Sequence, residues 1–188
     1  MNCHDDDETV VVMTVPEYQQ TPEVMYPQEL HHGQFVCRDA PLVSHQRIVL
    51  ALAVALLNYT RDHGGEVLIA PTDVILDVER ALVLQPDLLY VGPAGPARVG
   101  DRVEGPPNLV VEVLSPNPRI GRLEEKVDWY ARYGVEEIWL FHQFIYAVDV
   151  LTCGGGRVVN SARFQLTAPI QSLVLPAFRK TTASICGI

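Results

Sequence analysis

Short apolar runs bounded by proline, glycine and asparagine predict most of the strands of this chain. The clearest is Leu109 to Leu114, which lies between Pro-Pro-Asn and Ser-Pro-Asn-Pro and is interrupted only by Glu112. A run this apolar is typical of a strand covered on both faces. Alternation places Val110, Glu112 and Leu114 on one face and the remaining three residues on the other. A buried carboxylate without a partner costs several kcal/mol, so we expect a positive group against Glu112.

A second acid and a lysine are the candidates to meet Glu112. Leu82 to Val91 predicts another buried strand with one acidic interruption, Asp87. Arg122 to Tyr133 has the pattern of an amphipathic helix, and Lys126 borders its apolar stripe. Two carboxylates about 4 Å apart repel by roughly 4 kcal/mol at an effective dielectric constant of about 20, which a proton or a cation must offset. These residues favour a divalent-cation site, and a structural ion pair is the alternative reading of the same pattern.

The rest of the pattern alternates helical and strand segments. We expect Ser44 to cap a helix that runs to about His63 and is closed by Gly64-Gly65. Its middle, Ile48 to Leu57, is apolar all round, which predicts packing on more than one side. Other predicted elements are a helix from Thr14, a possible cap, to Gln20; a hairpin over Pro27 to Asp39; strands at Glu66 to Ala70, Val74 to Val78, Glu137 to His142, Phe144 to Leu151, Arg157 to Val159, Arg163 to Leu166 and Ser172 to Leu175; and a loop from Gly92 to Pro107.

Composition narrows the class of protein. A length of 188 residues suits one domain, which we place at residues 13–188 after a flexible acidic tail at 1–12. The formal net charge of -9 argues against tight nonspecific binding to DNA. Four scattered cysteines fit neither a zinc site nor a disulfide framework, so we expect reduced thiols. An acidic N-terminus is unlike a secretory signal, and the longest apolar run is half of the roughly 20 residues that a bilayer span needs. We expect a cytoplasmic protein that does not associate with membranes.

Five segments, in the same order along the chain, resemble the Uma-two family of restriction endonuclease-like proteins, which belongs to the PD-(D/E)XK nuclease superfamily. The resemblance implies an α/β fold of the restriction-endonuclease kind, with a central mixed sheet flanked by helices and an N-terminal hairpin. It also implies metal-dependent hydrolysis of phosphodiester bonds in nucleic acid, with DNA as the expected partner. The matching segments are QELHHGQFV (Gln28 to Val36), SHQRI (Ser44 to Ile48), QPDLLYV (Gln85 to Val91), PPNLVVEVLSP (from Pro106 or Pro107 to Pro116) and EKVDWYARYGVEEIWL (Glu125 to Leu140).

The resemblance also assigns roles to residues. Asp87 and Glu112 would hold Mg²⁺ or Mn²⁺ with the backbone carbonyl of Val113, and Glu29 would be an auxiliary acid. The superfamily's usual lysine would fall two residues after Glu112, where this chain has leucine. In the Uma-two family that lysine lies on the following helix, which matches Lys126 as the third catalytic residue.

Two positions depart from the family pattern. Arg122 and His142 stand where the family commonly has aspartate. Arg122 would place a second positive charge one helical turn from Lys126. The alternative function is therefore a catalytically silent binding or assembly module that keeps the nuclease fold. His45, in the first turn of the long helix, is expected to be a hydrogen-bonding residue rather than a ligand. Fold analogy adds a possible homodimer, because cutting a duplex requires two sites.

Overall fold

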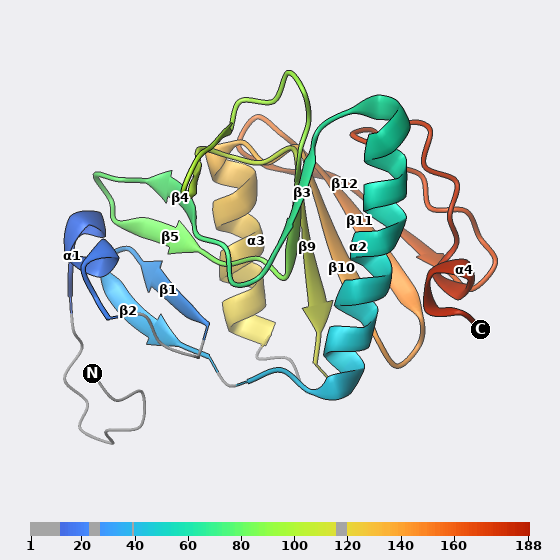
Figure 1. The fold of residues 1–188 in the computed structure, drawn as a ribbon, viewed down its shortest axis with the longest axis horizontal. Helices are drawn as coiled ribbons and strands as arrows, with labels where there is room; N and C mark the ends of the chain where they lie inside the picture. The colour runs from blue at the N-terminus through green and yellow to red at the C-terminus, as the bar shows by residue number, and fades with distance from the viewer. Residues whose placement is uncertain (1–11, 23–26, 39, 116–119) are drawn as a thin grey trace.

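The computed structural model of the protein is a mixed α/β fold with two mixed sheets and few helices (Figure 1). It describes residues 12–22, 27–38, 40–115 and 120–188. The predicted acidic tail falls almost entirely outside these residues. In chain order the elements are α1 (Val15–Gln19), β1 (Gln28–His31), β2 (Gln34–Cys37), α2 (Val43–His63), β3 (Glu66–Ile69), β4 (Val74–Asp77), β5 (Leu82–Leu84), β6 (Leu88–Val91), β7 (Arg98–Val99), β8 (Val103–Glu104), β9 (Leu109–Leu114), α3 (Ile120–Tyr133), β10 (Glu137–His142), β11 (Ala147–Gly154), β12 (Arg157–Gln165) and α4 (Thr182–Cys186).

One six-stranded sheet, in the order β12-β11-β10-β9-β6-β3, has the longer strands and is called the larger sheet below. Strands β9 and β10 are parallel, and the other neighbours are antiparallel. The alternation predicted for Leu109 to Leu114 is confirmed, because Leu109, Val111 and Val113 pack in the cluster under α2 whereas Val110 packs in the cluster under α3. Both faces of β9 are covered, and all six of its residues are buried.

Helices α2 and α3 lie on opposite faces of this sheet (Figure 1). Helix α3 and its face of the sheet also pack against apolar residues of a second sheet, in the order β2-β1-β5-β4-β8-β7. The expectation of one central sheet flanked by helices is therefore correct for the larger sheet and incomplete for the molecule. Four strands of the second sheet lie in segments predicted as strands, and the other two, β7 and β8, are two residues long and lie within the predicted loop. The second sheet was missed because local pattern does not show which strands pair.

The segment from Leu82 to Val91 is not one strand, as predicted, but two. Strand β5 belongs to the second sheet and β6 to the larger sheet, with residues 85–87 between them. Pro86 has no N–H to donate to a ladder, so the pairing ends there and the chain passes from one sheet to the other. This break places Asp87 where the two sheets meet.

The long helix also differs from its prediction. Helix α2 begins at Val43, and Leu42 is its N-cap residue without a side-chain cap, so Ser44 is not the cap. Its inner residues are buried, but Leu50, Val54 and Leu57 are 64%, 51% and 47% exposed. The helix packs on one face of the larger sheet and against α4, and these exposed apolar residues lie on the part of its surface that the described residues leave uncovered. Packing on more than one side is therefore confirmed only in part.

Other boundaries are close to the predicted ones. Thr14 caps α1 as proposed, through a capping box with Glu17. The two short strands predicted in the C-terminal part form one strand, β12, and Ser172 to Leu175 is not a strand. Cys37 is disulfide-bonded, which contradicts the expectation of reduced thiols, whereas Cys153 and Cys186 are free. No helix in the described part of the chain is long and apolar enough to cross a membrane.

Candidate metal centre

The register of the larger sheet brings the two predicted acids together. Strands β6 and β9 pair antiparallel from Tyr90 opposite Leu109 to Leu88 opposite Val111. Asp87 immediately precedes Leu88, and Glu112 immediately follows Val111, so the two acids lie beside each other at this end of the pairing. The proximity also has an electrostatic effect, because the charge of Asp87 raises the pKa of Glu112.

Glu112 lies against α3 and is 5% exposed. Its Oε1 atom lies 2.5 Å from Nζ of Lys126 and accepts a hydrogen bond of 2.9 Å from the hydroxyl of Tyr130. Lys126 and Tyr130 are four residues apart on α3, so they point to the same side of the helix. The predicted lysine is therefore in contact with the predicted acid, and the positive partner expected from the burial of Glu112 is found.

Glu29 is the second partner of Lys126 and the most enclosed acid of the group. It comes from β1 of the second sheet and is fully buried. Its Oε1 accepts from Nζ of Lys126 at 2.9 Å and from the backbone N–H of Gln85 at 2.9 Å. Its Oε2 lies 2.9 Å from Nε2 of His31 and accepts from Nε and Nη2 of Arg38 at 3.0 and 2.8 Å. Lys126 thus joins the two sheets through one carboxylate from each.

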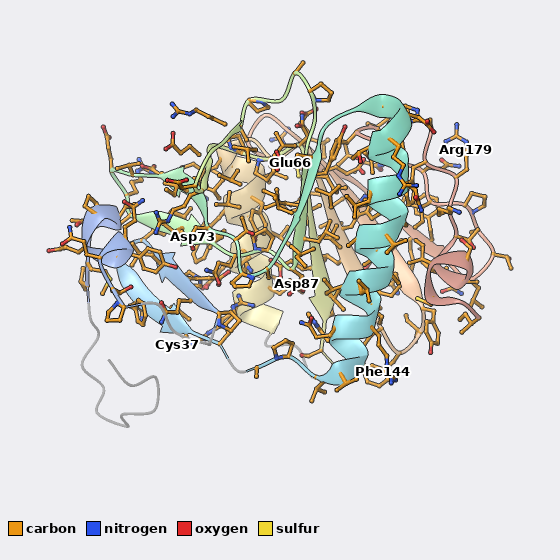
Figure 2. All side chains as sticks on the ribbon, viewed as in Figure 1. Cys37, Glu66, Asp73, Asp87, Phe144 and Arg179 are labelled. Atoms are coloured by element: carbon orange, nitrogen blue, oxygen red, sulfur yellow. The ribbon has the colours of Figure 1, made fainter. Side chains whose placement is uncertain are left out.

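Asp87 is held by groups from two other elements. Its Oδ2 accepts the backbone N–H of Val113 at 2.7 Å and lies 3.1 Å from Nε2 of His45, in the first turn of α2. In Figure 2 Asp87 lies between α2 and α3. The other ring nitrogen of His45, Nδ1, is buried and has no hydrogen-bond partner in the described structure. His45 is therefore a hydrogen-bonding residue, as predicted, and its partner is a candidate metal ligand.

The two glutamates have opposite electrostatic environments. Burial alone would raise the pKa of Glu29, but Lys126, His31, Arg38 and the N–H of Gln85 together hold it well below its ordinary value. Burial raises the pKa of Glu112, Lys126 opposes this, and Asp87 adds to it, so that the pKa stays above its ordinary value. Glu29 is therefore the permanent counter-ion of Lys126, and Glu112 is the acid that most needs a further cation when it is charged.

The free oxygens of the two acids define what the site could bind. Oδ1 of Asp87 and Oε2 of Glu112 have no hydrogen-bond partner among the described residues. No group of three or more His, Cys, Asp or Glu side chains in the described ranges could hold a metal ion by itself. Mg²⁺ differs from most transition metals in this respect, because it is commonly bound by one or two carboxylates and keeps several waters. The donor set therefore fits Mg²⁺ and does not fit a site built wholly from side chains.

Sequence reasoning missed most of the groups that hold these acids. Gln85 and Tyr130 belong to segments quoted for the family resemblance, but nothing in the local pattern shows that they contact Glu29 and Glu112. Arg38 lies near the end of the predicted hairpin and has no distinguishing signal. Of the two departures from the family pattern, Arg122 is exposed and forms no ion pair within the described residues. The other departure, His142, places its Nε2 atom 2.8 Å from Oδ2 of Asp149.

Comparisons with known proteins identify the family and the fold of the chain. Residues 15–184 match the family model Uma2, described as "Putative restriction endonuclease". A crystal structure of a "putative nuclease belonging to DUF820" from Anabaena variabilis has 13% sequence identity to this chain and a TM-score of 0.77, with 93% of this chain and 98% of that one covered. This likeness shows a shared fold. No curated protein matches the chain. Because the family model spans nearly the whole chain, the protein belongs to the Uma2 family.

Proposed function

We propose that this protein is a metal-dependent endonuclease that hydrolyses phosphodiester bonds, with DNA as its substrate. The observation that supports this most directly is the proximity of Asp87, which immediately precedes β6, to Glu112 of β9, with Lys126 in contact with Glu112. Two acids and a lysine are the groups required to hold a divalent cation and to stabilise charge at a phosphate. Membership of the Uma2 family supports the same reaction class.

Mg²⁺ or Mn²⁺ would be held by Asp87 and Glu112 through their free oxygens, with the backbone carbonyl of Val113 as the expected third ligand. Such an ion supplies a water of lowered pKa and stabilises negative charge on the phosphoryl oxygens. In this proposal the N–H of Val113 and Nε2 of His45 keep Asp87 in place through its Oδ2, which leaves Oδ1 for the ion.

Lys126 would orient the attacking water or stabilise the charge that develops in the transition state. Its contact with Glu29 gives it a fixed position that does not depend on Glu112. When Glu112 turns to a cation, Nζ therefore keeps a counter-ion, and its charge remains beside the reacting phosphate. Glu29 thus acts through Lys126 rather than as a ligand in this proposal. A homodimer would supply one such site for each strand of a duplex.

Glu112→Gln tests the proposal, because the amide keeps the shape of the side chain and removes the charge that a cation needs. Plasmid DNA is incubated with Mg²⁺ or Mn²⁺ and either the wild type or the variant. Glu66→Gln is the matched control, since Glu66 is exposed at the start of β3, and Figure 2 shows it away from Asp87. We expect cleavage by the wild type and by Glu66→Gln and none by Glu112→Gln. Equal cleavage by all three proteins would contradict the assignment.

A catalytically silent module is the second candidate, and one contact favours it. Nζ of Lys126 already bridges Glu29 and Glu112, and such a bridge can serve purely to join the two sheets. Calorimetric titration with Mn²⁺ separates the two functions. A metal-dependent nuclease binds Mn²⁺ with heat that disappears in Asp87→Asn, whereas a silent module gives no heat above background in either protein.

A further inference from the structure

A row of side chains extends from Glu112 across the larger sheet to its outer strand. Glu112 of β9 pairs with Leu140 of β10, Leu140 pairs with Asp149 of β11, and Asp149 pairs with Arg163 of β12. Directly opposed residues point to the same face of a sheet, so all four lie on the face that carries Glu112. With about 4.8 Å between strands, three steps separate the ends of the row by about 14 Å.

The outer end of this row holds an arginine in a fixed orientation. Nε and Nη2 of Arg163 donate to Oδ1 and Oδ2 of Asp149 at 2.6 and 2.7 Å. His142, at the end of β10, places Nε2 at 2.8 Å from Oδ2 of the same carboxylate. His142 is opposite Leu114 in the parallel ladder and therefore shares the face of Glu112. Both carboxylate oxygens of Asp149 are thus in contact with side chains of the protein.

Arg163 keeps the capacity to bind an anion. Its side chain is 52% exposed, compared with 27% for His142 and 15% for Asp149. A guanidinium has five N–H groups, and Asp149 takes two of them. The Nη1 nitrogen has no partner among the described residues. An arginine held by a bidentate carboxylate with donors directed outward is suited to phosphate, which it binds in the same planar geometry.

We propose that Arg163, positioned by Asp149 and His142, contacts a backbone phosphate of nucleic acid whose reacting phosphate lies at the site of Glu112. This inference rests on the proposed function, because it takes nucleic acid as the ligand. One strand of B-form DNA carries a phosphate every 3.4 Å along the axis, so a row of about 14 Å spans on the order of four phosphates. A protein with a net charge of -9 needs such local cations to hold a polyanion.

The salt dependence of binding tests the proposal. Affinity for a short fluorescein-labelled DNA duplex is measured by anisotropy at several salt concentrations in EDTA, so that no cleavage occurs. Each phosphate contact contributes about 0.9 to the slope of log affinity against log salt for duplex DNA. We expect Arg163→Gln to lower the slope by about this amount, and Arg163→Lys, which keeps the charge, to restore most of it. His142→Asn should weaken binding and leave the slope near that of the wild type.

Arg179→Gln is the matched control, since it removes one positive charge elsewhere. Arg179 donates to the carbonyl oxygens of Pro176 and Phe178, next to the cluster under α2, and Figure 2 shows it far from Asp87. We expect the wild-type slope for this control. A wild-type slope for Arg163→Gln, or an equal loss in both variants, would overturn the phosphate contact and identify a structural cross-strand ion pair. Cleavage assays on Glu112→Gln decide the proposed function separately. Absence of any DNA binding by the wild type would overturn both.

Discussion

The two glutamates that contact Lys126 should respond differently when each is changed to glutamine. Glu29→Gln should mainly lower the stability of the fold, and Glu112→Gln should mainly abolish activity. Glu29→Gln removes the only acid of the pair that is fully buried and permanently charged. Lys126 and Arg38 would then lose the carboxylate to which both donate. Removing one partner of a buried ion pair typically costs about 3–5 kcal/mol, because a buried charge is left without compensation. For a domain of this length that corresponds to a fall in Tm of about 6–20 °C.

Glu112→Gln should be much less destabilising. Lys126 keeps Glu29 as its counter-ion, and the amide oxygen of the new side chain can still accept from Tyr130. The expected cost is about 1–2 kcal/mol, which is in the range for weakening a buried hydrogen bond. Activity should show the reverse order, since Glu112 is the proposed ligand and Glu29 acts only through Lys126.

Urea unfolding followed by circular dichroism measures both costs at pH 7. The double variant Glu29→Gln/Lys126→Met provides the internal control, because it removes both members of the Glu29–Lys126 pair and so measures the coupling between them. Its destabilisation should be smaller than the sum of the two single changes. A loss of stability in Glu112→Gln equal to or greater than that in Glu29→Gln would refute the division of roles between the two acids.

The lowered pKa of Glu29 determines how the difference in stability between the wild type and Glu29→Gln depends on pH. A carboxyl group whose pKa is lower in the folded state stabilises the protein above its unfolded value, about 4.3 for glutamate. This stabilisation is lost as the pH falls below that value toward the folded pKa. The wild type should therefore exceed Glu29→Gln in stability by a constant amount from pH 8 to about pH 5, and by progressively less in more acidic buffers. A stability difference that grows as the pH falls would contradict a lowered pKa for Glu29.

Three further substitutions test how the sheets and helices are held. Leu52→Ala opens a cavity under α2, where Leu52 is fully buried, and should cost about 2–5 kcal/mol in urea unfolding; a cost below about 1 kcal/mol would show that the helix is loosely packed. Gly65→Ala should destabilise by more than about 1 kcal/mol, because φ is +88° and the added Cβ would lie 2.7 Å from the carbonyl oxygen of Val91; a neutral effect on Tm would contradict this. Glu137→Ala removes the acceptor shared by Nε1 of Trp139 and the N–H of Leu173, so hydrogen exchange at the Leu173 amide should become faster. Unchanged protection of that amide would mean that other contacts fix the C-terminal segment.

The separation of functional groups between two sheets explains why the site was only half visible in the sequence. Glu112 stood out because a single charge in an apolar run is improbable without a partner. Glu29 lies in a four-residue strand of ordinary polarity, so only the family resemblance singled it out in the sequence, and its burial and its contact with Lys126 appear only in the structure. His45 belongs to a segment that the family resemblance included, yet local pattern could not show that it meets Asp87 across 42 positions of the chain.

Local pattern by itself determined the elements with a strong period. The strand at β9 and its two faces, the helix with Lys126 on the edge of its apolar stripe, the hairpin and the capping of α1 all follow from interactions within a few residues. The tertiary structure decided that the segment from Leu82 to Val91 divides at Pro86, that α2 leaves one apolar face open, and that Lys126 takes one carboxylate from each sheet. These outcomes depend on which strands pair and which faces meet. Pairing is fixed by contacts between distant parts of the chain, and no local period encodes the partner.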